Sequence, residues 1–439
     1  MVPPVLRLVI AGILALAPVA RVDIGLAGQG PARVSAPTED AVSMITDSGE
    51  GLKYWPRWRG PSGQGLVTGT DYPDRWSSTE NVAWKVAVPG QGNSSPIVWS
   101  DRIILTTAYD DGRRLSVLAL RRSDGGKLWE TAVPAGRNDW AHGKNGHASS
   151  TPATDGTRIY ALFGSRGLVA LDMEGRIQWR ADIGPTDNYH GPAGSPLLYK
   201  DKVVLYQDQS RDAFVAAFDT RTGKQVWRTR REASVGWGTP IAVRVVDHDE
   251  IIVNSQRAVQ AYHPDTGKEL WRCNGMGYEV IPTPVVGHGM VFCSSGRAGP
   301  TLAIKPGGSG DVTRTHVAWS TERGSPFVPS PLVYRNQLYM VNDMASIVTS
   351  FDAATGKSLW QGRLGVAQRE GFSASPVAVD GKVFFTNDEG ETFVLRAGPA
   401  FTLMHVNALN ERVLASPALV DGRWYFRTER SMYAIGAAH

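Results

Sequence analysis

Arginine residues recur at one kind of place in the chain, the loops that follow the second strand of a repeated unit. Each guanidinium presents a rigid fork of donors that fits a carboxylate or a phosphate. A ring of such groups would attract an anionic ligand or an acidic protein surface, whereas solvated turn arginines are the competing interpretation. The candidate residues of this partner-binding face are Arg113, Arg114, Arg166, Arg211, Arg257, Arg297 and Arg430.

Imidazole and amide side chains gather in two further loops, residues 138–147 and 188–190. Neutral imidazole is a good ligand for zinc and copper. The spacing of these residues fits no closed tetrahedral site, and histidines in polar loops often only form hydrogen bonds. We therefore expect a polar cluster at the mouth of a channel, and no metal site. Its members are His142, Asn145, His147 and His190.

Established catalytic patterns are missing from the sequence. It has no Gly-x-x-x-x-Gly-Lys-Ser phosphate loop, no His-Glu-x-x-His zinc motif, no Gly-x-Ser-x-Gly turn and no Cys-x-x-Cys-His haem motif. The 46 basic and 42 acidic residues leave a net charge of only +4 and are scattered along the chain. This balance argues against a nucleic-acid partner. The sequence thus assigns no catalytic residue.

The elements that must position these side chains come from an internal repeat. A Ser-Pro or Thr-Pro pair followed by an apolar run occurs eight times. Each copy reads as four short strands rich in β-branched and aromatic residues, separated by turns. The length of a copy is typical of a four-stranded propeller blade. The repeat prolines are Pro96, Pro152, Pro196, Pro240, Pro284, Pro331, Pro376 and Pro417.

An eleven-residue pattern, Ala-x-Asp-x-x-Thr-Gly-Lys-x-x-Trp, spans the third strand and its turn. It is clearest at residues 217–227, 261–271 and 350–360. Glycine supplies the positive φ that the turn requires. The tryptophan is a large rigid plate, which we expect to fill the wedge between adjacent blades. It recurs at Trp129, Trp179, Trp227, Trp271, Trp319 and Trp360.

The last copy stops one strand short of a full blade. Residues 81–88 read as a fourth strand that has no blade of its own, and pairing them with the last copy would close the ring without a free edge. In blade seven we place the fourth strand at Phe401–His405, which lacks the tryptophan. The sequence predicts an all-β, eight-bladed β-propeller of four-stranded antiparallel blades, closed by an N-terminal strand.

The N-terminus is typical of a secretory signal, with an apolar run after Arg7 and small residues near Ala27. A short membrane anchor is the alternative. We expect a signal peptide over residues 1–27, a flexible linker over 28–53 and the propeller over 54–439, in the periplasm or secreted. In that oxidising environment Cys273 and Cys293 either form a disulfide or remain free thiols.

The Ser-Pro strand and the eleven-residue pattern resemble the PQQ-like β-propeller repeat family. That family includes quinoprotein alcohol dehydrogenases and the propeller lipoprotein of the outer-membrane β-barrel assembly machinery. For a dehydrogenase the resemblance implies pyrroloquinoline quinone (PQQ), calcium held by Glu, Asn and Asp, and a disulfide between adjacent cysteines. In this chain the two cysteines are far apart, and loop residues such as Asn342, Asp343, Asn387, Asp388 and Glu389 are ordinary turn residues. We expect no cofactor, with PQQ and calcium as the alternative.

The functional face is expected where the longer loops lie. In an antiparallel blade, the connections to the next blade and those between strands two and three share one face, and short turns occupy the other. We predict a non-catalytic binding or assembly scaffold for a protein or anionic polymer of the cell envelope. The alternatives are a PQQ-dependent dehydrogenase and a structural component of an outer-membrane assembly complex.

Overall fold

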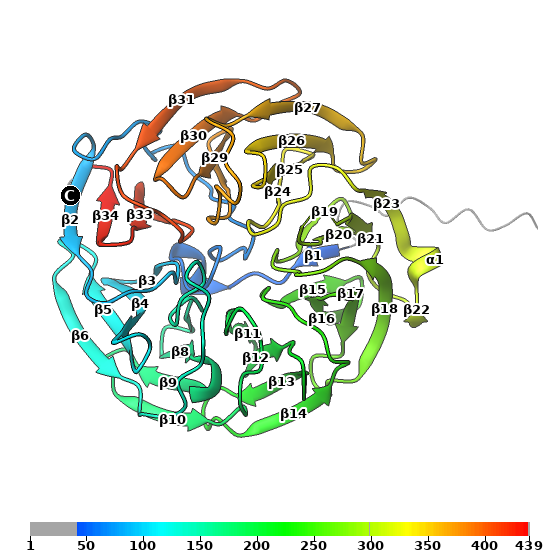
Figure 1. The fold of residues 1–439 in the computed structure, drawn as a ribbon, viewed down its shortest axis with the longest axis horizontal. Helices are drawn as coiled ribbons and strands as arrows, with labels where there is room; N and C mark the ends of the chain where they lie inside the picture. The colour runs from blue at the N-terminus through cyan, green and yellow to red at the C-terminus, as the bar shows by residue number, and fades with distance from the viewer. Residues whose placement is uncertain (1–41, 298, 438–439) are drawn as a thin grey trace, which may run out of the picture. The chain divides into compact units, whose positions relative to one another are not determined.

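Eight antiparallel sheets form a ring around a central channel in a computed structural model that describes residues 42–297 and 299–437 (Figure 1). The predicted eight-bladed propeller is confirmed, and the first strand of each blade lies nearest the channel (Figure 1). The segments expected as a signal peptide, 1–27, and most of the expected linker lie outside the described residues.

Each blade contains four short strands, which follow one another in the sheet from the channel outward. The first four blades consist of β3 (Ile97–Trp99), β4 (Arg102–Tyr109), β5 (Arg114–Arg121) and β6 (Lys127–Ala132); β7 (Ala153–Thr154), β8 (Arg158–Leu162), β9 (Leu168–Asp172) and β10 (Ile177–Ala181); β11 (Leu197–Tyr199), β12 (Lys202–Gln207), β13 (Phe214–Asp219) and β14 (Gln225–Arg230); β15 (Ile241–Val245), β16 (His248–Asn254), β17 (Arg257–Tyr262) and β18 (Glu269–Met276). The last four consist of β19 (Val285–Gly287), β20 (Met290–Ser294), β21 (Thr301–Ile304) and β23 (Val317–Thr321); β24 (Leu332–Tyr334), β25 (Gln337–Asn342), β26 (Ile347–Asp352) and β27 (Ser358–Arg363); β28 (Val377–Val379), β29 (Lys382–Thr386), β30 (Glu391–Arg396) and β31 (Leu403–Ala408); β32 (Ala418–Val420), β33 (Arg423–Arg427), β34 (Ser431–Ile435) and β2 (Val82–Ala87).

The ring closes as predicted. Strand β2 pairs antiparallel with β34 and completes blade eight, with Lys85 opposite Tyr433. A paired strand at this position leaves no open edge between the two ends of the repeat array. The fourth strand of blade seven, β31, begins two residues beyond the predicted Phe401.

Tryptophans of the fourth strands fill the wedges between blades. Trp227 is 7% exposed, and its indole N–H donates to the Pro264 carbonyl in the third-to-fourth-strand turn of the next blade at 2.8 Å. Gly267 in that turn has φ +70° and lies against the Trp227 ring, so a side chain there would clash. The same indole-to-turn bond recurs in five more blades, from Trp84, Trp129, Trp179, Trp319 and Trp360.

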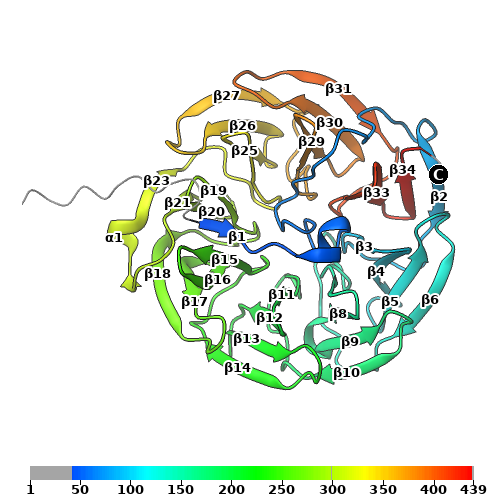
Figure 2. The same ribbon diagram turned by 180° about the vertical axis from the view of Figure 1, so that it is seen from behind.

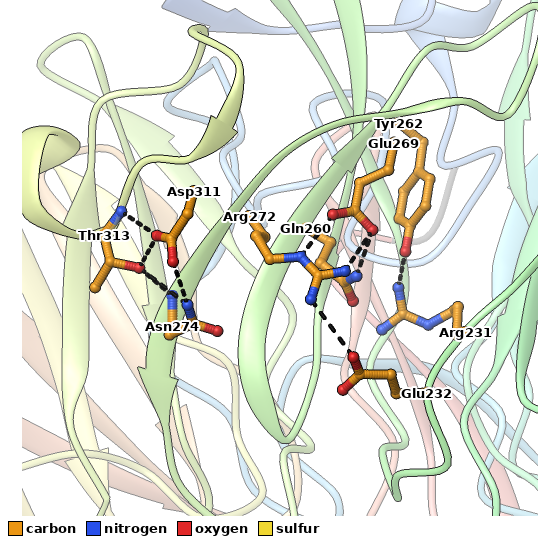
Figure 3. Close-up of polar contacts among 9 residues, drawn as sticks. All are labelled: Arg231, Glu232, Gln260, Tyr262, Glu269, Arg272, Asn274, Asp311 and Thr313. Atoms are coloured by element: carbon orange, nitrogen blue, oxygen red, sulfur yellow. Dashed lines mark hydrogen bonds and ion pairs between the residues drawn. The ribbon is translucent and has the colours of Figure 1, made fainter.

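Blade five interrupts this pattern. An insertion there carries β22 (Gly310–Asp311) and α1 (Thr313–His316), and β22 pairs in parallel with β18 of blade four. Figure 3 shows Asn274 at this edge donating to Asp311 and Thr313. With the ordinary turn replaced, the Trp271 indole donates instead to the buried Glu250 carboxylate at 2.9 Å.

The N-terminal segment crosses the middle of the ring and is seen in front in Figure 2. Strand β1 (Val42–Met44) pairs with β15, and the 3-10 helix η2 (Gly49–Lys53) follows. Further on, Trp55 forms a bridge with Val98 of blade one, and Leu66 with Ala378 of blade seven. Residues 42–53 belong to the range expected to be a linker. In the structure they form β1 and η2, which lie against the inner strands.

Both cysteines are free and buried, Cys273 in β18 and Cys293 in β20. Burial raises the pKa of the Cys273 thiol to about 11 and raises that of Cys293 as well. Both therefore remain protonated near neutral pH and are poor nucleophiles. Among residues 42–297 and 299–437, no helix is long and apolar enough to span a membrane.

Candidate functional site: the loop face and the channel mouth

Loops from all eight blades meet at one end of the channel. They are the connections from a fourth strand to the next first strand, and they enclose a cavity of about 270 Å³ that we call the channel mouth. Each connection contributes at least one lining residue: Asn93, Asn145, Ala193, Trp237, Ile281, Phe327, Ser373 and Leu414. Antiparallel pairing places these loops on the same face, so a ligand there contacts every blade.

Three of the four predicted polar residues meet at the mouth. The rings of His142 and His190 lie 5.1 Å apart, and the Asn145 amide donates to the backbone carbonyls of His190 and Pro192 at 2.8 and 3.0 Å. The fourth, His147, lines a neighbouring cavity instead, where its Nε2 lies 3.4 Å from Asp111 Oδ1.

His190 is held between aromatic and acidic groups. Its ring centroid lies 5.2 Å from that of Trp237, and its Nε2 lies 3.5 Å from Glu279 Oε1. Burial lowers the pKa of His190, and the Glu279 carboxylate opposes that effect. The imidazole is therefore mainly neutral near pH 7. Within the described residues, no group of three or more His, Cys, Asp or Glu side chains is placed to hold a metal ion.

A network of charges surrounds these rings. Glu279 accepts a hydrogen bond from the Tyr189 hydroxyl at 2.8 Å and pairs with Arg297. Lys144 Nζ forms an ion pair with Asp388 Oδ2 at 3.1 Å. Sequence reasoning missed Lys144 and Glu279 as site residues. Both residues lie in connections between blades, where a charged side chain is not needed for core packing, and this position could have identified them.

Two carboxyl groups near the mouth are removed from solvent, Asp343 completely and Asp388 in part. Asp343 is 0% exposed, and burial raises its pKa to about 6, although its Oδ1 accepts the Phe327 N–H at 2.7 Å. Burial also raises the pKa of Asp388, against the effect of Lys144. One oxygen of each carboxyl and the Nδ1 of His190 are buried without a hydrogen-bond partner in the described part of the chain. Such groups are costly and are typical of functional sites.

The seven predicted arginines do not converge. Arg297 lines the mouth. Arg166, in the 3-10 helix η3 (Gly164–Arg166), is 5% exposed and donates to the carbonyls of Gly112 and Arg113 at 3.0 and 2.7 Å. Arg211 is exposed and pairs with Asp187 at 3.1 Å. The other four are exposed on three loops: Arg113 and Arg114 are neighbours at the β4–β5 turn, and Arg257 and Arg430 lie on two further loops.

Exposed aromatic side chains gather on this same loop face. Trp140 is 62% exposed, Tyr189 48% and Tyr278 74%. Each lies in a connection from one blade to the next, as does Val366, which is 80% exposed. Large exposed aromatic groups on a rigid frame are typical of protein-binding surfaces.

The mouth does not match the site that a PQQ dehydrogenase would need. Of its acidic groups, Glu279 and Glu370 face Arg297, and Asp388 pairs with Lys144. A calcium ion takes about six to eight oxygen ligands, and these cations compete with it for the carboxylate oxygens. The cysteines are buried in blades four and five and do not reach the mouth cavity. No redox chemistry through that cofactor follows from this arrangement.

Comparison with known proteins agrees with the architecture. BamB, the outer membrane protein assembly factor, of Bordetella pertussis is 24% identical over 311 residues, covering 57% of this chain and 73% of that protein. Tetrathionate hydrolase of Acidithiobacillus ferrooxidans is 24% identical over 289 residues, 62% of this chain but only 53% of that protein. The chain thus spans about half the length of the hydrolase.

Solved structures share the fold at low identity. BamB from Moraxella catarrhalis superposes with a TM-score of 0.58 at 14% identity, covering 81% of this chain and 97% of that one. Quinohemoprotein alcohol dehydrogenase from Comamonas testosteroni has a TM-score of 0.61 at 13% identity, covering 88% and 81%. The family model described as outer membrane protein assembly factor BamB matches residues 61–211, 211–397 and 344–438. Since these matches cover most of the chain, the protein belongs to the BamB family of PQQ-like repeat propellers.

Proposed function

We propose that this protein is a non-catalytic binding and assembly scaffold of the cell envelope, which engages a protein partner through the loop face around the channel mouth. The observation that carries the proposal is the gathering of Trp140, Tyr189 and Tyr278 on that face. Aromatic side chains supply large contact areas at a low cost in conformational entropy, and they dominate binding energy at protein interfaces.

The frame beneath these loops supports the same function. Each loop is anchored at both ends in a blade, and at six of the eight blade junctions a tryptophan of one blade donates a hydrogen bond to a turn of the next. A frame of this kind presents its loops with little reorganisation on binding, which favours affinity. The name of the BamB relatives describes assembly of outer membrane proteins, and an expected signal peptide would bring this chain to the same compartment.

Charge supplies the specificity in this proposal. Arg211, Arg257 and Arg430 are exposed on the loops between strands two and three of the same face. Arg297 adds a partly neutralised charge at the centre. An acidic protein surface fits this distribution better than a neutral one, and its capture would weaken with added salt.

Site-specific photocrosslinking in cells tests the proposal. A photoreactive amino acid at position 140 or 278 should form the same discrete adduct with an envelope protein, because both positions lie on the proposed face. Position 246 is the matched control, since Val246 is 76% exposed but lies in the turn between β15 and β16 on the opposite face. Equal adducts from position 246, or none from 140 and 278, would contradict the proposal.

The dehydrogenase alternative has its own test. Purified protein is incubated with PQQ, calcium and an artificial dye, and dye reduction is followed with alcohols and sugars. The scaffold proposal expects no reduction above the protein-free background. Substrate-dependent reduction that Trp237→Ala abolishes would overturn it, because Trp237 is the aromatic wall of the mouth.

A further inference from the structure

A second cavity lies at the seam where blade eight meets blade one. It measures about 470 Å³, and we call it the seam cavity. Its walls are rich in glycine, including Gly90 and Gly92 of the connection that closes the ring, and Gly112 and Gly146 from the neighbouring loops. A β-carbon on Gly92 would come within 2.6 Å of Arg427 Nη2. The missing side chains leave room for the cavity and for this guanidinium.

Arg427 is a buried cation that has no counter-charge among residues 42–297 and 299–437. It ends strand β33, lines the seam cavity and is 2% exposed. Its Nη1 donates to Ser94 Oγ and to the Thr106 carbonyl, both at 2.7 Å. Among the described residues, no carboxylate pairs with it, and its Nε and Nη2 donate no hydrogen bond. Burial lowers its pKa to about 9.

The repeat itself shows that this charge is exceptional. In every blade the residue after the repeat proline pairs with a residue of the second strand, and Arg427 lies two positions beyond that partner in blade eight. Fold geometry therefore does not require a cation at this position. The corresponding residues of blades one to seven are all neutral: Thr106, Leu162, Tyr206, Asn254, Ser294, Val341 and Thr386.

Two other buried arginines show what a structural role looks like in this propeller. Arg231 pairs with the buried Asp208 at 2.7 Å, and Figure 3 shows its guanidinium also reaching Tyr262. Arg59 donates one Nη to the Pro331 carbonyl at 2.9 Å and the other to that of Pro376 at 3.3 Å. Arg231 also lines a small cavity of about 90 Å³, but its charge is paired with Asp208. Of these three arginines, only Arg427 both lines a cavity and lacks a carboxylate partner among the described residues.

The remaining charged residues of the seam cavity are all exposed to solvent. Arg412 lines it as well, is exposed and forms no ion pair with a described residue. The lining carboxylates, Asp110, Asp111 and Glu429, are all exposed to solvent, where water screens them. A negative group at the buried end would therefore be attracted strongly to Arg427 and repelled weakly by the rim.

We propose that the seam cavity binds a small oxyanion or the anionic group of a small molecule, a carboxylate or a phosphate, with Arg427 holding it at the buried end and Arg412 at the entrance. A guanidinium with two free N–H-bearing nitrogens binds such a group in a bidentate manner. Because Asn93 and Leu414 line both the seam cavity and the channel mouth, an occupied seam cavity adjoins the proposed binding face.

Thermal unfolding and calorimetry with two probes test this site. Inorganic phosphate and succinate are each titrated into the full protein against sodium chloride at equal ionic strength. At least one of them should raise Tm in a concentration-dependent way. Phosphate alone, succinate alone or both would each support the site and identify its anion class. If neither anion raises Tm more than sodium chloride does, the proposed site is overturned.

Three variants separate this site from general charge effects. Arg427→Gln should abolish the rise in Tm or weaken binding at least tenfold, the effect of losing hydrogen bonds from a charged donor. Arg211→Gln is the matched control, because it removes an exposed charge of the same face and should keep the full response. Arg412→Gln, at an exposed position, should weaken binding even if Arg427→Gln fails to fold. An unchanged response in both Arg427→Gln and Arg412→Gln would contradict the proposal.

Discussion

The two faces of the propeller are built from the same repeat but differ in how well their polar groups are paired and their side chains buried. On the face of the short turns, glycines of one blade receive the tryptophans of its neighbour, and polar atoms of the turns are paired. On the loop face, buried oxygens of Asp343 and Asp388 lack hydrogen-bond partners in the part of the chain that the structure describes, and Trp140 and Tyr278 face solvent. The contrast shows where stability is generated and where it is given up. The regular turns hold neighbouring blades together through the tryptophans, and this leaves the connecting loops free to vary and bind.

The largest expected effect lies on the turn face. Trp227→Ala should lower the free energy of unfolding by about 3–5 kcal/mol, because it removes a nearly buried indole and leaves a cavity between blades three and four. Urea unfolding followed by circular dichroism measures this. A loss below about 1 kcal/mol would mean that the indole-to-turn contacts do not hold the blades together.

A buried carboxyl group should make the loop face sensitive to pH. In the folded protein the pKa of Asp343 is raised to about 6 from its ordinary value of 3.8, so its contribution to stability is present at low pH and lost as pH rises through about 6. Asp343→Asn should therefore stabilise the protein by about 2–3 kcal/mol at pH 7.5 and by less at pH 5. Unfolding curves at both pH values measure the difference. If the difference in stability between Asp343→Asn and the unmodified protein is the same at both pH values, the pKa of Asp343 is not raised in the folded protein.

The N-terminal segment that crosses the middle of the ring should contribute less to stability than the tryptophans, but by a measurable amount. Gln64 Oε1 accepts the buried Val286 N–H at 2.6 Å, so Gln64→Ala leaves that donor unpaired. We expect a loss of about 1–2 kcal/mol in chemical unfolding. Lys53→Ala, which removes only an exposed pair with Glu50, is the control and should change stability by less than about 0.5 kcal/mol. Equal effects from the two variants would mean that the segment is not docked.

The smallest expected effect on stability accompanies the largest on binding. Trp140→Ala removes a side chain that is 62% exposed, so the free energy of unfolding should change by less than about 0.5 kcal/mol. Partner capture should nevertheless fall severalfold, because exposed aromatic residues often contribute much of the binding energy at an interface. Urea unfolding and pull-down of the partner identified by crosslinking are measured on the same preparation of the variant. If Trp140→Ala loses as much stability as Trp227→Ala, the two faces do not differ in their contribution to stability.

The fold was predictable because its signals are local. Repeat prolines and tryptophans recur with the blade, and the unpaired strand at residues 81–88 could only belong to the incomplete last copy. The path of residues 42–67 was not predictable, because it depends on contacts with inner strands such as that of Leu66 with Ala378, which is far away in the sequence. No periodicity marks it.

The site was predictable only in part. His142, Asn145 and His190 share two neighbouring loops, which placed them together. Residue type alone could not separate the buried Arg166 from the exposed Arg211, because the turn of η3 decides where the side chain points. Arg427 was hidden for a related reason. Its exceptional position emerges only when paired strands of all eight blades are compared in register.

The central claim, that the loop face binds the partner, is tested most directly by hydrogen–deuterium exchange on the complex trapped by crosslinking at position 140. Amides that lack regular pairing exchange readily unless a partner covers them. Protection should appear in residues 133–150 and 277–283, and the turns at residues 219–224 and 263–268 on the opposite face should exchange as in the free protein. Protection of those turns with unchanged exchange in the loops would contradict the account.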